Sequence, residues 1–477
     1  NNVFIKNSFF RIITVIVITS FTYANIVVAQ GRGISIIRDA ESEQIIRDIT
    51  EPIFEAAELD KDAVATYLLR DNTINAFVMG GQNIFLNSGL ILKAENLGQV
   101  VGVVAHETGH ITGGHLSNRS EGMSQMAAYT LLGLLLGVAA MAAGSADAGM
   151  ALMMGGQQIG YRTLLRFTRT QESSADQAAI SLLEKAEMSA KGLIEFFEIL
   201  GEQELVPRKY QDPYARTHPL THERIERARD RVQESPYYDK PTDPVLEEKF
   251  MLLQAKLFGY LKPLHATLVR YPLSDTTLLA RYARTFAYQQ HDEINNALME
   301  INSLLEDYPE NPFFHETKGQ ILFENGEVIS SINSYEKAVE YLPSSPLIRL
   351  ALAQSLISSE QDKYLNQAIE NLNYALNEDP TNSFGWKQAS IAYHRNDNEG
   401  MRHFATAQHF LLSGNIRGAM INAKKAVDLL PKNSPKRIQA QDILVISEAN
   451  MSKKMRKAKE KNEDKEREQR KKERNRS

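Results

Sequence analysis

Hydrophobic residues follow two different spacings in the first half of this 477-residue chain. In residues 41–59 they recur every three or four positions, which predicts an amphipathic helix. Residues 63–91 instead hold short apolar runs separated by Asp71-Asn72 and Gly80-Gly81, which predicts strands joined by turns. We therefore expect residues 30–235 to form one α+β domain, mostly helical with a small sheet.

From residue 245 to about residue 450 the pattern is helical throughout and repetitive. The helix-ending residues Pro309 and Pro343 are 34 residues apart, which is the period of tetratricopeptide helix pairs. Later intervals are less regular, with 37 residues to Pro380 and 51 more to Pro431. We expect an all-α tetratricopeptide-repeat solenoid with a concave surface for polypeptide partners. An unrelated helical bundle is the alternative.

Three further segments flank these two domains. Lys6 and Arg11 precede or begin an apolar run that ends at Ala29, and this pattern predicts a signal peptide over residues 1–29 and export of the protein. A buried first helix or a retained membrane anchor is the alternative. Three prolines within "SPYYDKPTDP" predict a linker over residues 236–244. Residues 451–477 are a charged tail that has almost no apolar residue to bury.

Composition and charge exclude several classes of function. The chain has no cysteine, so disulfides, thiol catalysis and a cysteine-ligated zinc site are excluded. The net charge is −5 although the tail is basic, so the body of the protein is acidic and offers no footprint for nucleic acid. The basic tail is expected to act as a solubilising extension or to touch an anionic surface.

The segment "HETGH" carries the strongest chemical signal. On a helix, His106 and His110 are one turn apart and project from the same face, so both imidazoles can reach one zinc ion. Glu107 lies beside them and is expected to act as the catalytic base. The pattern predicts one Zn²⁺ per chain.

The third ligand has to come from elsewhere in the chain. His115 is one residue short of the metzincin spacing and, on a continuing helix, would lie about 140° around from His110. We therefore expect His115 to lie on the surface or to contact a ligand residue without binding the metal itself. The segment "RTQESSADQAA" offers Glu172 as the third ligand and, one turn later, Asp176 as the acceptor for the free N–H of a ligand imidazole.

Four segments together resemble the zinc peptidases related to HtpX and to the prenyl-protein-processing enzymes. They are HETGH, the following GGH, ESSAD and THPLTHERI. The resemblance implies a gluzincin fold with His106, His110 and Glu172 on zinc and Glu107 as the base.

The same resemblance concerns a His-Pro that is followed by an arginine. His218-Pro219 and Arg224 match this pattern, which makes His218 the candidate for a fourth zinc position or for a donor to the oxyanion. His222 is the rival. Arg224 is expected to contact the ligand residues without binding the metal itself.

The order of signal peptide, peptidase domain and repeats resembles periplasmic members of this group from Gram-negative bacteria. That resemblance implies a protease that degrades misfolded or misassembled outer-membrane proteins and assists their assembly, with the repeats contacting the β-barrel assembly machinery. A chaperone-like adaptor with a latent protease domain is the rival class. The run Asn75, Ala76, Phe77 and Val78 could hold substrate as an added strand, or it could be an ordinary core strand.

Residues 122–146 contain no charge and are long enough to cross a membrane. A single crossing would separate His106 and His110 from Glu172, and only residues 148–161 remain before Arg162 for a second crossing. We expect a hairpin packed over the active site. A pair of membrane helices, and hence a membrane-integrated quality-control protease, is the alternative.

Overall fold

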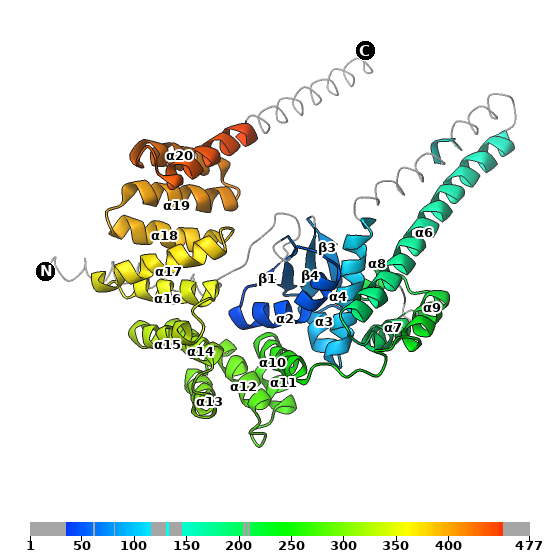
Figure 1. Cartoon of the computed structure of the whole chain (residues 1–477), viewed down its shortest axis with the longest axis horizontal. Helices are drawn as coiled ribbons and strands as arrows, with labels where there is room; N and C mark the ends of the chain where they lie inside the picture. Colours follow the sequence, from blue (N-terminus) through cyan, green and yellow to red (C-terminus); the bar gives the residue numbers. More distant parts are fainter. Residues whose placement is uncertain are drawn as a thin grey trace, which may run out of the picture. The chain divides into compact units, whose positions relative to one another are not determined.

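The computed structural model describes residues 35–60, 63–80, 82–115, 130–132, 146–203, 207 and 210–451. Two compact units divide the chain, Asn1–Ala287 and Tyr288–Ser477 (Figure 1). The predicted signal peptide at 1–29 lies outside the described residues, and so does the charged tail beyond Met451.

A four-stranded sheet lies in the first unit in the order β1-β2-β4-β3. Strands β1 (Ile36–Ile37) and β2 (Thr66–Leu69) are antiparallel, and β2 pairs in parallel with β4 (Asn83–Asn87). Strand β3 (Ala76–Met79) pairs with β4 in antiparallel fashion and stands at the edge of the sheet. The small sheet predicted from the short apolar runs is confirmed.

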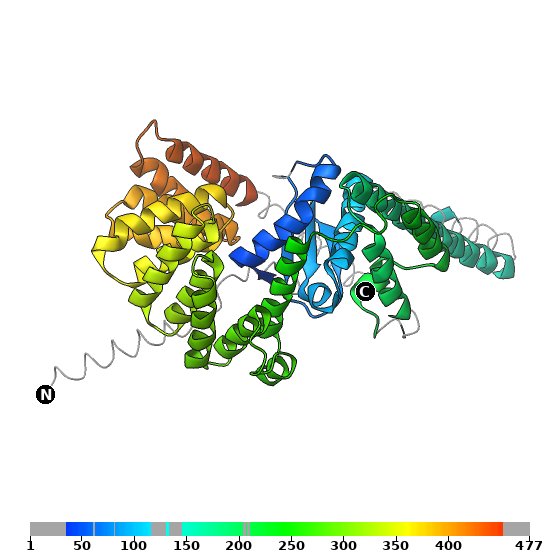
Figure 2. The ribbon, with the colours of Figure 1, turned by 60° about the horizontal axis from the view of Figure 1, so that its bottom comes forward.

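Helices make up most of the rest of the first unit. Helix α2 (Ala40–Ala56) packs along β2 and is drawn in dark blue in Figure 2. The other helices are α3 (Ser88–Lys93), α4 (Leu97–Thr112), α6 (Ala146–Lys185), α7 (Lys191–Gln203), α8 (Pro213–Thr217), α9 (His222–Gln233), α10 (Pro244–Leu261), α11 (Leu264–Arg270) and α12 (Leu278–Gln290).

Helix α4 lies in the middle of this unit because its surface allows two other helices to come very close. The Asn96 side chain accepts a hydrogen bond from the Gln99 N–H and caps its start. A Cβ on Gly102 would lie 2.7 Å from Leu193 Cα of α7, and a Cβ on Gly109 would lie 2.7 Å from the carbonyl oxygen of Ala175 in α6. The helix that carries HETGH is therefore fixed on both sides by backbone packing.

Helix α10 also belongs to the core of the first unit. Its side chains Phe250, Leu253 and Leu257 are buried in the same hydrophobic cluster as the sheet and α4. The Gln254 amide donates hydrogen bonds of 2.8 Å to the carbonyls of Ile91 in α3 and of Ala94, which directly follows α3. The compact unit therefore runs on to Ala287, past the residue at which the sequence predicts that the repeats begin.

A buried charge cluster ties α10 and α12 to α2. The Lys256 ammonium contacts Asp39 at 2.7 Å and Glu41 at 3.1 Å, and the Tyr282 hydroxyl donates to Glu41 at 2.5 Å. Because Lys256, Glu41 and Tyr282 are all buried, losing one partner would leave the others unpaired in the interior.

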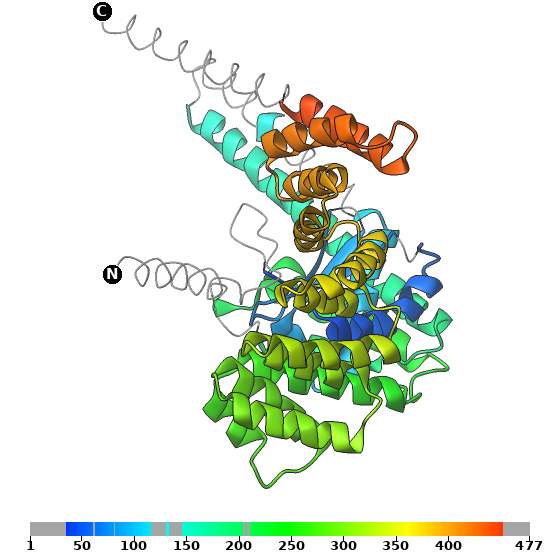
Figure 3. The ribbon, with the colours of Figure 1, turned by 90° about the vertical axis from the view of Figure 1, so that its left-hand side faces the viewer.

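Paired helices build the second unit, and successive helices stack on one another along the chain (Figure 3). They confirm the predicted all-α repeat solenoid. Within one repeat, a Cβ on Gly319 would lie 3.0 Å from the ring of Tyr335, so a small residue is required there. The helices include α13 (Ile294–Asp307), α14 (Pro312–Glu324), α15 (Val328–Tyr341), α16 (Pro346–Ser358), α17 (Leu365–Glu378), α18 (Ser383–Arg395), α19 (Glu399–Leu412) and α20 (Ile416–Leu429), and residues 435–451 are also helical.

The two irregular repeat intervals have structural causes. Between Pro343 and Pro380 the chain contains an additional short helix, η2 (Asp362–Tyr364). Between Pro380 and Pro431 it contains three helices, α18, α19 and α20, in place of two.

The charge-free stretch 122–146 lies outside the described residues except for positions 130–132 and 146. The predicted hairpin over the active site therefore stays a prediction. In the described part of the chain, no helix combines the length and the apolar character that a membrane crossing needs.

Candidate metal centre

Three separate segments bring four ionisable side chains to one point in the first unit. Helix α4 supplies His106 and His110, helix α6 supplies Glu172, and the turn after α8 supplies His218. One nitrogen or oxygen atom of each lies within 4.8 Å of the others, and all four residues are buried. The sequence predicted all four of these residues for the site, although His106 and His218 are 112 positions apart in the chain.

The separations between these atoms match those around a tetrahedral metal ion. His106 Nε2 lies 3.1 Å from His110 Nε2 and 3.4 Å from His218 Nδ1. Glu172 Oε2 lies 3.0 Å from His218 Nδ1 and 3.5 Å from His106 Nε2. Donor atoms bound at 2.0–2.1 Å to a tetrahedral ion are about 3.3 Å apart. The four residues therefore fit one divalent metal ion.

A second layer of charged groups orients the ligands. Asp176 Oδ1 lies 2.9 Å from His106 Nδ1, so this nitrogen donates its proton outward and Nε2 faces the cluster. Arg224 donates to both oxygens of Asp176 and lies 3.1 Å from Glu172 Oε2. A further Arg224 hydrogen bond of 2.9 Å reaches the carbonyl of Pro219 and holds the turn that carries His218.

The electrostatic environment favours positive charge at the centre. Burial opposes a charge on His106, but Asp176 and Glu172 outweigh it and raise the pKa of His106 to about 9. Burial and the neighbouring His106 lower the pKa of His110 to about 2, so its lone pair is free at neutral pH. Although burial opposes it, His218 and His106 hold the pKa of Glu172 well below its usual range. The cluster attracts a proton or a metal ion.

Glu107 is placed to move a proton and is separate from the four ligand residues. Its side chain is buried, and burial raises the pKa of its carboxyl group above the usual value. Oε1 lies 3.6 Å from His218 Nε2 and accepts no hydrogen bond within the described part of the protein. A carboxylate oxygen held this way beside a metal position suits a base that takes a proton from water.

Tyr214 is a site residue that sequence reasoning missed. Its ring stacks on His218, with ring centroids 4.4 Å apart and an angle of 25° between the planes. Its backbone N–H donates to the carbonyl of Ile74 at 3.3 Å, which ties the His218 turn to the segment that precedes β3. A tyrosine four residues before His-Pro looks like any core aromatic, so the sequence carried no separate signal for it.

The proposed substrate strand lies at the sheet edge. Ala76, Phe77 and Val78 belong to β3, Asn75 directly precedes it, and β3 packs against α4. The ring of Phe77 stacks on the ring of Phe85 in the paired strand β4, with ring centroids 5.3 Å apart. Within the described residues the opposite edge of β3 has no paired strand.

The two remaining histidines of the motifs lie outside the four-residue group. His222 is exposed at the start of α9. Helix α4 ends at Thr112, so the 140° rotation expected for His115 on a continuing helix is wrong. His115 Nδ1 instead lies 2.8 Å from Nδ1 of His110.

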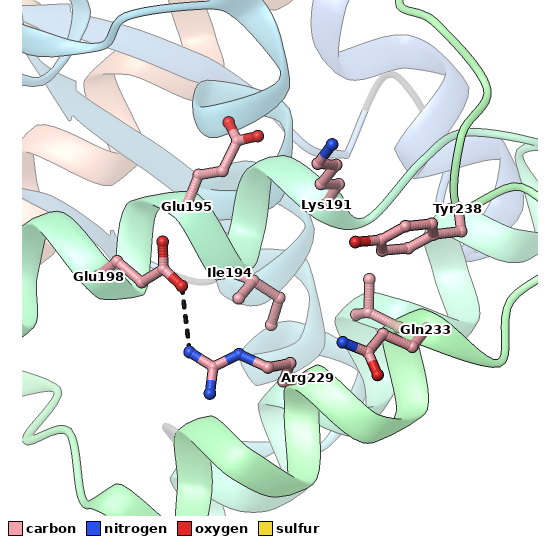
Figure 4. Close-up of a pocket in the computed structure, with 8 residues that line it drawn as sticks. Lys191, Ile194, Glu195, Glu198, Arg229, Gln233 and Tyr238 are labelled. Atoms are coloured by element: carbon pink, nitrogen blue, oxygen red, sulfur yellow. Dashed lines mark hydrogen bonds and ion pairs between the residues drawn. The ribbon is translucent and has the colours of Figure 1, made fainter.

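A small surface pocket between α7 and α9 has a volume of about 130 Å³ and shares no residue with the metal centre (Figure 4). Arg229 donates to Glu198 across it at 3.0 Å, as the dashed line in Figure 4 marks. Of the other charged groups that line it, Glu195 accepts a hydrogen bond of 3.0 Å from the Asn96 amide, and the Lys191 ammonium lies over the ring of Tyr238.

Comparison with known proteins shows what these features are similar to. Residues 39–232 match "Peptidase family M48". The beta-barrel assembly-enhancing protease of Escherichia coli is 25% identical over 401 residues, which cover 82% of this chain and 80% of that protein. The protein of the same name from Yersinia pestis is 24% identical, over 74% of this chain and 72% of its own length. The metalloprotease YcaL of Escherichia coli is 31% identical over 33% of this chain and 58% of its own length.

Proposed function

We propose that this metalloprotease, whose residues 39–232 match Peptidase family M48, is a zinc-dependent endopeptidase of the Gram-negative periplasm. Its substrates are misfolded or misassembled outer-membrane proteins, and it assists the assembly of β-barrels. The convergence of His106, His110, Glu172 and His218 on one buried point carries this proposal.

The donor set supports zinc as the metal. Two imidazoles one helical turn apart and one carboxylate are the usual ligands of a catalytic zinc site, and the chain contains no cysteine that would suit a thiolate-bound metal. His106, His110 and Glu172 would hold the ion. His218 is a fourth donor at similar distance, which would close the site in the resting protein.

The residues of this centre have separate roles in peptide hydrolysis. When bound, Zn²⁺ lowers the pKa of a nearby water and polarises the peptide carbonyl. Glu107 takes the proton of the attacking water and passes it to the leaving amine. His218, once turned from the centre, can donate a hydrogen bond to the developing oxyanion. Asp176 and Arg224 keep the ligands in place, and the free edge of β3, with Asn75 leading into it, would hold the substrate as an added strand.

The substrate class and location are supported by the named relatives. The proteins from Escherichia coli and Yersinia pestis are beta-barrel assembly-enhancing proteases, and the similarity extends over most of this chain and most of theirs. The repeats at 288–451 would serve as the platform for unfolded barrel proteins and for the β-barrel assembly machinery. We place the protein at the periplasmic face of the outer membrane and assign it no role with nucleic acid. Because α10 packs in the core of the first unit, we propose that the peptidase domain runs past the predicted limit at residue 235 and that the repeats begin at Tyr288.

The second candidate is a chaperone-like adaptor whose protease domain is mostly latent. The observation that favours it is the fourth protein donor, His218, since a site with four protein ligands leaves no open position for water.

One experiment separates these two candidates. The purified chain is incubated with a denatured outer-membrane barrel protein, and the same barrel protein in its folded state serves as the control. We expect cleavage of the denatured form only, loss of cleavage with a zinc chelator, and recovery on addition of Zn²⁺. Binding of the denatured protein without any cleavage would favour the adaptor. Cleavage that survives complete removal of the metal would contradict the enzyme as described.

A further inference from the structure

The chain turns back sharply after the HETGH helix and returns His115 to the site. Helix α4 ends at Thr112, and Gly114 adopts a φ of +62°, a left-handed conformation that favours glycine. The ring of His115 then lies 4.9 Å from the ring of His110, with an angle of 75° between the two planes. The two Nδ1 atoms are 2.8 Å apart, which is hydrogen-bonding distance.

Gly113 provides the space for this arrangement. Its φ of −75° is one that any residue adopts, so its backbone does not require glycine. A Cβ at this position, however, would lie 2.5 Å from Nε2 and 2.9 Å from Cδ2 of His115. The Gln171 amide of α6 also donates to the carbonyl oxygen of His115 at 3.4 Å. Both glycines of the GGH segment and a contact from α6 therefore favour one position of the His115 ring.

We propose that His115 is a positioning residue that orients the ligand His110. The inference rests on the proposed metal site. His110 points Nε2 to the centre, 3.1 Å from His106 Nε2 and 3.4 Å from Glu172 Oε1. Its outer nitrogen Nδ1 then carries the proton and donates it to the lone pair on His115 Nδ1. This bond fixes the tautomer and the plane of the His110 ring.

The two histidines of HETGH are thus held by different partners. The outer nitrogen of His106 meets the carboxylate of Asp176 at 2.9 Å, whereas that of His110 meets a second imidazole. His115 does not ligate the ion itself, because its Nδ1 is engaged with His110 and its Nε2 lies over Gly113. A neutral acceptor orients His110 without adding a negative charge to a centre that already contains three buried carboxylates, Glu107, Glu172 and Asp176.

Zinc affinity of the full-length chain, measured by competition with a chelator, tests the proposal. We expect His115→Ala to bind Zn²⁺ with about 10–100-fold lower affinity while reaching full occupancy at high Zn²⁺. His115→Asn places an acceptor oxygen near the position of Nδ1 and should recover affinity to within about threefold of the wild type. The exposed His222 is the matched control, and His222→Ala should bind as the wild type does. Equal affinity of His115→Ala and wild type, or no recovery with His115→Asn, would overturn the proposal.

A double-mutant cycle with Gly113 sharpens the test. Gly113→Ala should weaken zinc binding in the wild-type background, because the new Cβ displaces the His115 ring. In the His115→Ala background the same change should have no further effect. Additive losses would show that Gly113 and His115 act separately and would reject this account of GGH. Thermal unfolding of the metal-free variants checks that none of them acts through general loss of folding.

The outcomes also separate this inference from the proposed function. A wild-type chain that binds zinc and cleaves, together with unchanged affinity in His115→Ala, would overturn the role of His115 alone. A wild-type chain that binds no zinc would overturn both.

Discussion

The peptidase unit and the repeat unit are stabilised in opposite ways. In the first unit, α4 is packed between α6 and α7, and its residue His106 meets partners that lie 70 and 112 positions away in the chain. In the second unit, each helix packs mainly on the next, through small residues such as Gly319 and Ala338. A local change should therefore act globally in the first unit and stay local in the second.

The largest effect is expected from shortening the chain. A chain that ends at Asp243 lacks α10 and therefore Phe250, Leu253 and Leu257 of the core. Each of these buried side chains contributes about 1.5–3 kcal/mol. Their combined loss approaches the whole stability of a domain, which is about 5–15 kcal/mol. We expect no cooperative unfolding from this chain in a thermal melt. A chain that ends at Gln290, after α12, should fold and bind stoichiometric zinc.

This result would show that the peptidase domain extends past residue 235, where the sequence predicts its end. A cooperative thermal transition and bound zinc in the shorter chain would show that α10 belongs to the repeats and not to the peptidase core.

The next largest effect is expected from the ligands. His110→Ala and Glu172→Ala each remove one donor atom from the centre, so zinc content should fall far below one per chain and proteolysis should be lost. Circular dichroism of the repeat helices should not change, because the second unit has its own core. Metal analysis after dialysis measures the first effect. If Glu172→Ala keeps its zinc while His115→Ala loses it, the ligand set is wrong.

The substitution His218→Ala should change the rate of proteolysis by about 100-fold, in one of two directions. If His218 is a resting ligand, the substitution opens the site and raises proteolysis. If it donates to the oxyanion, the same change lowers turnover. Initial rates on a denatured barrel protein distinguish these two roles. A rate within about twofold of the wild type, far below the effect of losing an oxyanion donor, would reject both roles.

The smallest effect is expected in the repeats. A Cβ on Gly319 would lie 3.0 Å from the ring of Tyr335, so Gly319→Ala should cost about 1–3 kcal/mol of unfolding free energy in the second unit. Zinc affinity and cleavage of short peptides should stay unchanged. Hydrogen exchange measured repeat by repeat would locate the loss. Loss of zinc in this variant would contradict the separation between the two units.

The sequence was informative where one local pattern determines the outcome. His106, Glu107 and His110 follow from the pitch of a single helix, and the repeat solenoid follows from the spacing of Pro309 and Pro343. Glu172 and Asp176 could be chosen because their residue types complete that chemistry, whereas Arg224 and His218 followed only from the family resemblance.

The remainder depends on contacts that no local pattern reports. The end of α4 and the turn at Gly114 decide where His115 lies. The sequence alone does not show that the helix stops before His115. Tyr214 has the same pattern as any core aromatic. Helix α10 follows a proline-rich segment that reads as a domain boundary, and only its burial against the core assigns it to the first unit.

The central claim is that Glu107 moves the proton while other residues hold the metal. Glu107→Gln keeps the size of the side chain and removes its basicity, so zinc content and proteolysis are measured on the same preparation of this variant and of the wild type. The account predicts near-stoichiometric zinc in both proteins and cleavage of the denatured barrel protein by the wild type only. Normal turnover by Glu107→Gln, or loss of its zinc, would contradict it.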